Sequence, residues 1–261
     1  MKPNLAVFTM AAMLAGAWTA QAATYTIEHS HSQGIGYADV SFNGGASTVN
    51  SYLGRFIMEP IPLTELPPQY PIYDISTVHG IEKGFFSYCI EPLQSIGVGH
   101  GAAYQYEFSI NPLVGMDGFD AGDVDLVKEL FGLYCPLLKN DPTGPYTGGT
   151  FRTAAAALQL AVWKINLDRA TETLGAWDFS SGLMRIAAGA VPLESGASLR
   201  ADAVAVLMLN SLTGSGPMAS GLEGLKNPIP DAQELLIQVP EPATISMLAL
   251  GVLGLWKKRR A

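Results

Sequence analysis

The sequence predicts an α+β fold: a β-rich, sandwich- or barrel-like body with an inserted helical section from about 120 to 213. Three observations predict it. Short stretches in which apolar and polar residues alternate recur before residue 111, as expected for strands. Apolar residues at helical spacing are concentrated in the inserted section. Glycine and proline are frequent, with 28 and 17 residues, which favours short elements joined by turns.

The N-terminal part of the body is expected to consist of strands. Residues 24–28 and 37–42 alternate in polarity, and Gly44 and Gly45 supply a turn before a further strand at 51–58. These stretches predict neighbouring strands that are connected through a short turn.

Two more strands are expected after a proline-rich loop. Residues 59–73 hold five prolines, and proline cannot donate a hydrogen bond to a sheet, so this segment predicts a loop. Residues 83–91 alternate and predict a strand that is buried on both faces, with Tyr88 and Cys89 on opposite faces. Residues 104–110 are its expected neighbour.

The inserted section is expected to begin with a helix over 124–134, capped by Asp123 and ended by Pro136. Apolar residues repeat at helical spacing through it. The remaining expected elements are a long helix at 153–173, a third helix at 197–212 and a closing strand at 234–239.

The N-terminal residues have the three-part pattern of a signal peptide. Lys2 precedes an apolar stretch at 5–18, and small residues follow at Ala20 and Ala22. The apolar stretch is shorter than the ~20 residues of a membrane span, so it indicates a signal peptide. We expect the Sec machinery to export the chain and cleavage to follow Ala22.

The C-terminal residues combine Pro240, Glu241 and Pro242 with an apolar run at 244–256 and a basic cluster at 257–260. This combination resembles the PEP-CTERM sorting signal of bacteria with a Gram-negative envelope. The resemblance implies processing by an exosortase, a transient membrane anchor through the apolar run, and a product at the cell surface or in a biofilm matrix of exopolysaccharide. The expected organisation is a signal peptide at 1–22, an extracellular α+β domain at 23–238 and a sorting signal at 239–261.

The charge of the exported part excludes one class of partner. The two ends contain five basic residues and one acidic residue, which leaves 10 Lys and Arg against 22 Asp and Glu, a net charge of −12. A domain this acidic is not expected to bind nucleic acid or anionic membranes.

Two cysteines, Cys89 and Cys135, are present, and in an oxidising compartment a pair of cysteines predicts one disulfide. A second interpretation starts from two segments, residues 88–91 (Tyr-Cys-Ile-Glu) and residues 158–163 (Leu-Gln-Leu-Ala-Val-Trp). Together they resemble the paired signature of bacterial surface thioester domains, over a region from about 80 to 170. The resemblance implies an internal thioester between Cys89 and Gln159 that acylates an amine on a target. It departs from the family at Leu158, where a threonine is usual.

A thioester has to be shielded from water, and Phe86, Tyr88 and Trp163 are the expected shield. His79 and His100 are candidates to assist thiolate formation. The thioester and the Cys89–Cys135 disulfide exclude one another because Cys89 has one sulfur atom, and a further alternative is that the thiols stay free.

No pattern in the sequence supports conventional catalysis or a cofactor. His29 and His31 lack a third metal ligand, so no metal site is predicted, and phosphate-loop, dinucleotide and nucleophile-elbow motifs are absent from the sequence. We therefore expect a surface adhesin with a thioester, which would react once and is not an enzyme. The alternative is a non-reactive structural protein of the exopolysaccharide matrix.

Overall fold

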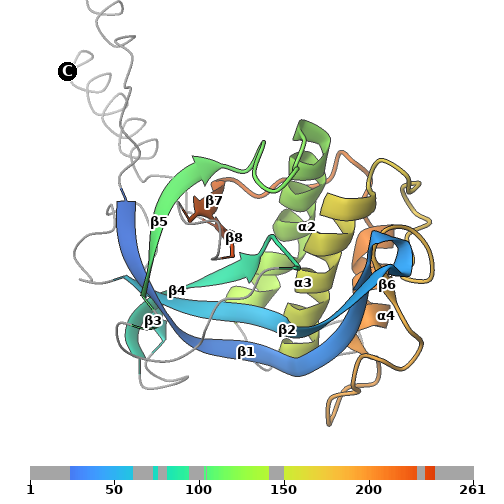
Figure 1. The fold of residues 1–261 in the computed structure, drawn as a ribbon, viewed down its shortest axis with the longest axis horizontal. Helices are drawn as coiled ribbons and strands as arrows, with labels where there is room; N and C mark the ends of the chain where they lie inside the picture. The colour runs from blue at the N-terminus through green and yellow to red at the C-terminus, as the bar shows by residue number, and fades with distance from the viewer. Residues whose placement is uncertain are drawn as a thin grey trace, which may run out of the picture.

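The fold is described by a computed structural model over residues 24–60, 73–75, 81–93, 103, 105–140, 150–227 and 233–238 (Figure 1). A curved antiparallel sheet forms one side of the molecule, and three helices pack beside it (Figure 1). This arrangement confirms the predicted α+β class.

Hydrogen-bond pairing closes most of the described strands into a ring. The strand order is β2-β1-β5-β7-β8-β4-β3, and β4 pairs with β2 as well, so that the sheet returns to its starting strand. All of these pairs are antiparallel, and β6 adds to β1 outside the ring. The body is therefore barrel-like. The strands are β1 (Thr24–Phe42), β2 (Ser47–Pro60), β3 (Tyr73–Ile75), β4 (Ile81–Cys89), β5 (Gln105–Pro112), β6 (Arg185–Ile186), β7 (Leu222–Lys226) and β8 (Leu235–Gln238).

The first two predicted strands belong to one long strand, β1, which forms a hairpin with β2 through a short 3-10 turn, η2 (Asn43–Gly45). Two irregularities let β1 bend without ending, one between His29 and His31 and one near Gly36. Gly36 has φ 98°, a conformation that glycine adopts without steric strain.

The helical section is inserted between two paired strands. The chain leaves β5, forms α2 (Ala121–Asn140), α3 (Phe151–Asp168) and α4 (Ala201–Asn210), and returns as β7 beside β5. Every residue of α3 from Thr153 to Ile165 is buried. Helix α3 contacts β1 and β2 as well as α2 and α4, so it lies between the barrel and the other two helices.

The N-terminus of α2 differs from the prediction. The helix begins at Ala121, and its cap is Asp120, whose Oδ1 accepts hydrogen bonds from the main-chain N–H groups of Gly122 (2.7 Å) and Asp123 (2.9 Å). Asp123 returns the contact, since its Oδ2 accepts from the N–H of Asp120 (2.8 Å). This reciprocal pair of hydrogen bonds is a capping box. Asp123 is the third residue of the helix, and Asp120 is the cap.

Three other boundaries also differ from the predictions. Helix α2 continues through Pro136 to Asn140, although an interior proline removes one helical hydrogen bond and usually kinks or breaks a helix. Helix α3 ends at Asp168 and not at residue 173, and α4 begins at Ala201, four residues later than expected. Strand β7 was not predicted, since its five residues show no regular alternation.

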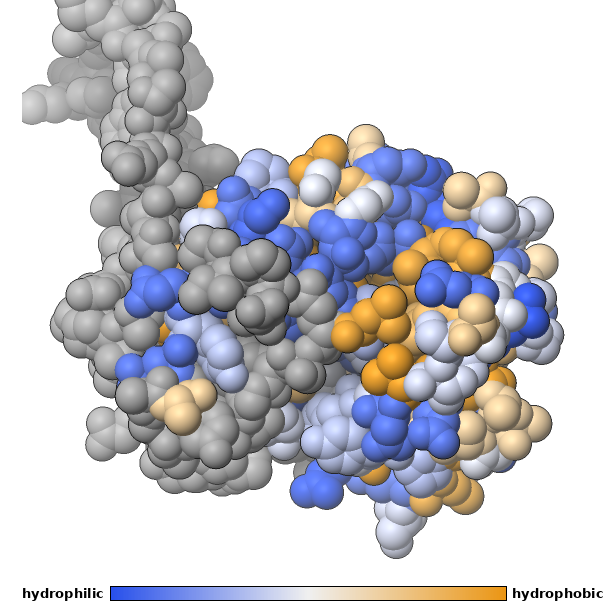
Figure 2. Space-filling view, in the orientation of Figure 1, coloured by the Kyte–Doolittle hydropathy of each residue, from blue (hydrophilic) through white to orange (hydrophobic). Residues whose placement is uncertain are grey.

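On the face in Figure 2, apolar residues lie among hydrophilic ones. None of the helices in the described ranges is long and apolar enough to cross a membrane. Large apolar side chains that are exposed come from several separate elements: Tyr37, Leu93, Val114, Leu174, Leu183, Leu193, Leu207 and Met218.

Candidate functional site: Cys89 and Gln159

Strand β4 and helix α3 bring Cys89 and Gln159 into direct contact, although 70 residues separate them in the sequence. The Cys89 N–H donates a hydrogen bond to Gln159 Oε1 (2.8 Å), and Gln159 Nε2 donates one to the Cys89 carbonyl oxygen (2.7 Å). Both residues are completely buried. The Gln159 carboxamide therefore brackets the main chain of Cys89 in the protein interior.

The bracket forms where two strands separate. Ser87 is the last residue of β4 that pairs with β2, and it lies opposite Phe56. The N–H of Ile90 donates to the Glu234 carbonyl oxygen on the other edge, beside β8 (2.9 Å). Because adjacent residues of a strand direct their main-chain groups to opposite edges, the N–H and C=O of Cys89 face the β2 side. Gln159 takes the place of the missing β2 residue there and satisfies both groups.

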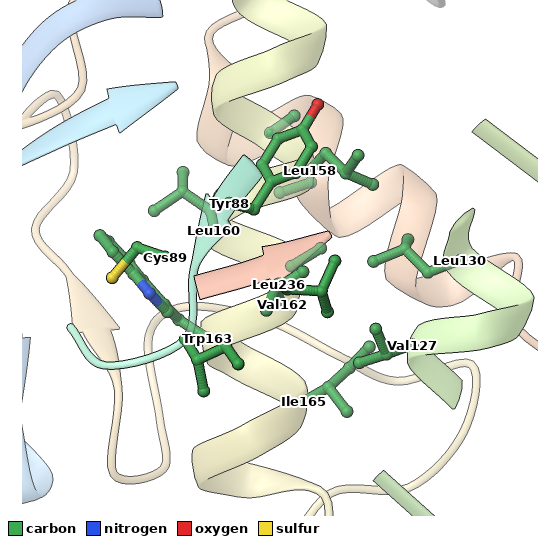
Figure 3. Close-up of a cluster of buried hydrophobic side chains, with 14 of the residues drawn as sticks. Tyr88, Cys89, Val127, Leu130, Leu158, Leu160, Val162, Trp163, Ile165 and Leu236 are labelled. Atoms are coloured by element: carbon green, nitrogen blue, oxygen red, sulfur yellow. The ribbon is translucent and has the colours of Figure 1, made fainter. Parts of the chain in front are cut away.

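The Cys89 sulfur lies next to the indole of Trp163, one helical turn beyond Gln159 (Figure 3). The thiol donates to the Glu91 carbonyl oxygen (2.9 Å). The Trp163 Nε1 atom is buried and has no conventional hydrogen-bond partner. Burial raises the pKa of the Cys89 thiol well above its usual value, and the neighbouring carboxylates act in the same direction, whereas the indole N–H lowers the pKa.

The expected shield is divided between two faces of β4. Trp163 lies on the side of the Cys89 sulfur, and Tyr88 points away from it (Figure 3). The ring of Tyr88 packs edge-on against Phe131 of α2, with 5.5 Å between ring centroids. Phe86 lies beneath the guanidinium of Arg55, 3.4 Å from its ring centroid. Of the three predicted residues, Trp163 is thus the one placed beside the sulfur, while the other two pack behind the strand.

Cys135 is buried on α2, and no disulfide joins it to Cys89 in the structure. His79 and His100, which we expected to assist thiolate formation, lie outside the described residues, as do the signal peptide and most of the sorting tail. Within the described ranges, no three His, Cys, Asp or Glu side chains gather closely enough to hold a metal ion.

Sequence reasoning missed a carboxylate near the site. Asp117, in the loop between β5 and α2, accepts a hydrogen bond at Oδ2 from Asn166 Nδ2 (3.3 Å), and Asn166 follows Trp163 on α3. Desolvation raises the pKa of Asp117 to about 7, and the nearby carboxylates of Glu91 and Glu234 add to the effect. Its approach to the site could not be predicted, because the sequence does not reveal which carboxylates the fold gathers.

The raised pKa of Asp117 predicts a measurable pH effect on stability. The folded state holds the proton more tightly than the unfolded state, so this group stabilises the protein in acid and the benefit is lost as pH rises from about 4 to about 7. Asp117→Asn should therefore raise the urea midpoint at pH 8 and leave it nearly unchanged at pH 4. The gain should be modest, because Asp117 is partly exposed to water. Parallel pH profiles of the two proteins would contradict this assignment.

The comparison with protein families identifies the C-terminus. Residues 238–260 match the family model of the PEP-CTERM protein-sorting motif. The chain is therefore an exported protein with a C-terminal sorting tail of the kind recognised by exosortase machinery. No curated protein sequence matches the chain.

Solved structures similar to the chain come from bacterial surface proteins. The N-terminal thioester domain of the fibronectin-binding protein SfbI from Streptococcus pyogenes is 14% identical with a TM-score of 0.42, over 87% of this chain and 97% of that one. The N-terminal thioester domain of a surface protein from Clostridium perfringens is 10% identical with a TM-score of 0.39, over 77% and 98%. The N-terminal domain of the Streptococcus pyogenes pilus tip adhesin Cpa is 14% identical with a TM-score of 0.41, over 82% and 99%.

Proposed function

We propose that this protein is a cell-surface adhesin in which Cys89 and Gln159 form an internal thioester that couples once to an amine on a target. The observation that carries the proposal is the double hydrogen bond between the Gln159 carboxamide and the Cys89 main chain. It holds the acyl carbon of Gln159 beside the main chain of Cys89, the residue that carries the thiol.

The chemistry needs no added reagent. The Cys89 sulfur adds to Cδ of Gln159, and negative charge develops on Oε1, which already accepts a hydrogen bond from the Cys89 N–H. A main-chain N–H that points at such an oxygen stabilises the tetrahedral intermediate. The C–N bond then breaks, and the thiol proton leaves with the amide nitrogen as ammonia. The products are a Cys89–Gln159 thioester and one ammonia molecule.

One side-chain rotation precedes this step. The thiol points to the Glu91 carbonyl oxygen in the described conformation. In one staggered rotamer of Cys89, the sulfur lies between the main-chain N and C atoms. This rotamer directs the sulfur to the β2 side of β4, where Gln159 lies. Exchange between staggered rotamers requires no change in the main chain, so the bracket persists while the sulfur turns.

The surroundings suit a bond that water would hydrolyse. Cys89, Gln159 and Trp163 are all buried, and α3 is apolar on both sides of the glutamine. A target amine that reaches Cδ replaces the sulfur, forms an amide and returns the proton to the thiolate. Each molecule reacts once, so the protein acts as a covalent binder and not as an enzyme. Its target would lie at the surface of another cell or in the exopolysaccharide matrix.

The second candidate function is a passive matrix or surface protein. One observation favours it: the bracket satisfies both polar groups of the Gln159 side chain, so the residue also has a purely structural explanation. In that case Cys89 stays free or pairs with Cys135, and the export route is unchanged.

The intact mass of the exported protein tests the proposal against the alternative. The matched control is Cys89→Ser, which keeps the main-chain groups that Gln159 contacts and removes only the sulfur. Gln159→Ala is a poorer control, because it also leaves two buried main-chain groups without partners.

We expect the wild-type mass to fall one ammonia short of the mass calculated from its sequence. The mass of Cys89→Ser should equal the mass calculated from the variant's own sequence. The wild-type protein should also take up methylamine, which the variant should not. A wild-type mass short by two hydrogens and restored on reduction would establish the Cys89–Cys135 disulfide and reject the thioester. A mass with no deficit would reject both bonds and leave the passive function.

A further inference from the structure

We propose that the indole N–H of Trp163 stabilises the Cys89 sulfur as a thiolate, and so promotes release of the acyl group to the target. The inference rests on the proposed thioester and extends it, because it assigns a chemical role to a residue that would otherwise serve only as apolar cover. Trp163 is then a catalytic residue for the transfer step, because it contacts the reacting sulfur.

The indole nitrogen is an unusual buried donor. Trp163 is 2% exposed, and Nε1 has no conventional hydrogen-bond partner among the described residues. An unpaired buried N–H is destabilising, and tryptophan can only donate. The ring lies with its nitrogen beside the Cys89 sulfur (Figure 3). The donor is thus directed at the sulfur, which gains negative charge when it leaves during acyl transfer.

The position of the helix explains this arrangement. Gln159 and Trp163 are one turn apart on α3, so they project from the same face. Gln159 holds the main chain of Cys89, and Trp163 meets its side chain. The ring itself is fixed from behind by Phe42 of β1, with the two centroids 6.4 Å apart in an edge-on arrangement. The direction of the N–H is therefore set by packing before any reaction.

The charge balance around the sulfur makes such a donor necessary. The charged groups that act on Cys89 are Glu91, which follows β4, and Asp117 in the loop before α2, and both disfavour a thiolate. Neither of these groups is a cation. A neutral N–H is then the available means of stabilising the negative sulfur. The Glu91 carbonyl oxygen accepts a hydrogen bond from the protonated thiol, but it has no proton to donate to a thiolate.

The donor also discriminates between the bound and the released sulfur. A thioester sulfur accepts hydrogen bonds poorly, whereas a thiolate accepts them strongly. Once the C–S bond breaks, the sulfur turns back to its position beside the indole (Figure 3), where the N–H stabilises the thiolate as the leaving group.

An isosteric substitution separates this role from packing. Replacing Trp163 by benzothienylalanine exchanges the N–H for sulfur and keeps the ring size, and Trp163→Phe removes the N–H with a smaller ring. The matched control is Trp177→Phe, because Trp177 is equally buried with an unpaired Nε1 and is anchored to Asn210 of α4 through its main chain. All variants are made in the full chain with Cys135→Ala, so that Cys89 is the only thiol.

Two readouts are measured after export. The first is the rate of methylamine uptake, which we expect to fall about tenfold to a hundredfold in both Trp163 variants and to stay unchanged in Trp177→Phe. The second is the titration of the Cys89 thiol by thiolate absorbance after reaction with methylamine, or directly if no thioester is present. The thiolate should form at higher pH in both Trp163 variants.

The outcomes test the role of Trp163 separately from the existence of the thioester. Wild-type uptake and an unchanged titration in the benzothienylalanine protein would overturn the role of Trp163 while leaving the thioester intact. A wild-type chain without the ammonia deficit would reject the thioester, and the titration alone would then decide whether the indole stabilises the thiolate. A slower uptake with an unchanged titration would assign Trp163 to packing and also overturn the inference.

Discussion

Lys164→Met is expected to destabilise the protein by about 3–5 kcal/mol, because it removes one partner of a buried ion pair and leaves the other partner unpaired. Lys164 Nζ lies 2.7 Å from Asp168 Oδ2, and neither side chain is exposed to solvent. Nζ also contacts Glu172 at 3.2 Å. Without the lysine, Asp168 would retain a buried negative charge with only main-chain donors around it.

The pair also fixes a segment that has little regular structure. Lys164 donates to the carbonyl oxygens of Ser181 (2.9 Å) and Met184 (3.2 Å), and Asp168 accepts from the main-chain N–H groups of Leu183 and Met184. The last turn of α3 therefore holds the loop that leads into β6. Loss of the lysine should loosen this loop as well as the helix end.

The measurement is urea denaturation of Lys164→Met beside Lys226→Met. Lys226 makes an ion pair with Glu234 at 3.8 Å, but its side chain is 52% exposed. The control should change the free energy of unfolding by less than about 1 kcal/mol. Equal losses in the two variants would show that the buried pair has no special weight.

Lys164 and Asp168 also show where sequence reasoning reaches its limit. The apolar stripe of α3 was predicted from helical spacing, and its residues Leu158, Ala161 and Val162 are buried. The same spacing assigns charged residues to the exposed face. In the protein both are buried, because they satisfy one another and the main chain of a distant loop. A helix that is buried on all sides cannot be recognised from one sequence when its polar residues find partners elsewhere.

The candidate site was predictable to a similar extent. The alternation in β4 correctly separates Tyr88 from Cys89, and this separation already implied that Tyr88 could not cover the sulfur. The pairing of Cys89 with Gln159 came from a family resemblance, since nothing in their spacing predicts contact over 70 residues. The approach of Asp117 was not predictable, because it depends on how the loop after β5 folds back onto α3.

Glu129→Gln is the second change with a large expected effect. The Glu129 side chain is buried on α2, and its carboxylate accepts hydrogen bonds from the N–H groups of Thr213 (2.9 Å), Gly214 (2.7 Å) and Gly216 (3.1 Å) and from the Thr213 hydroxyl (2.9 Å). A Cβ atom on Gly216 would lie 2.3 Å from Glu129 Oε1, so a glycine is required for this close approach. The carboxylate thus anchors the loop between α4 and β7.

Glutamine cannot reproduce these contacts. Both carboxylate oxygens act as acceptors, and a carboxamide would direct its NH₂ group at a main-chain N–H in one of the two positions. The substitution removes a charged acceptor and leaves at least one donor unpaired, which should cost about 2–4 kcal/mol. Asp125→Asn, at an exposed position of α2, should change the free energy of unfolding by less than about 0.5 kcal/mol.

The pH dependence identifies the cause of the loss. Burial tends to raise the pKa of Glu129, but the hydrogen bonds from Thr213, Gly214 and Gly216 outweigh it and hold the pKa below its usual value. A carboxyl group with a lowered folded pKa stabilises the protein above its unfolded pKa and loses that contribution as pH falls through the folded value. The wild type should therefore approach Glu129→Gln in stability in acid, below about pH 4, and exceed it most at neutral pH. A constant difference across this range would mean that shape, and not the charged acceptor, anchors the loop.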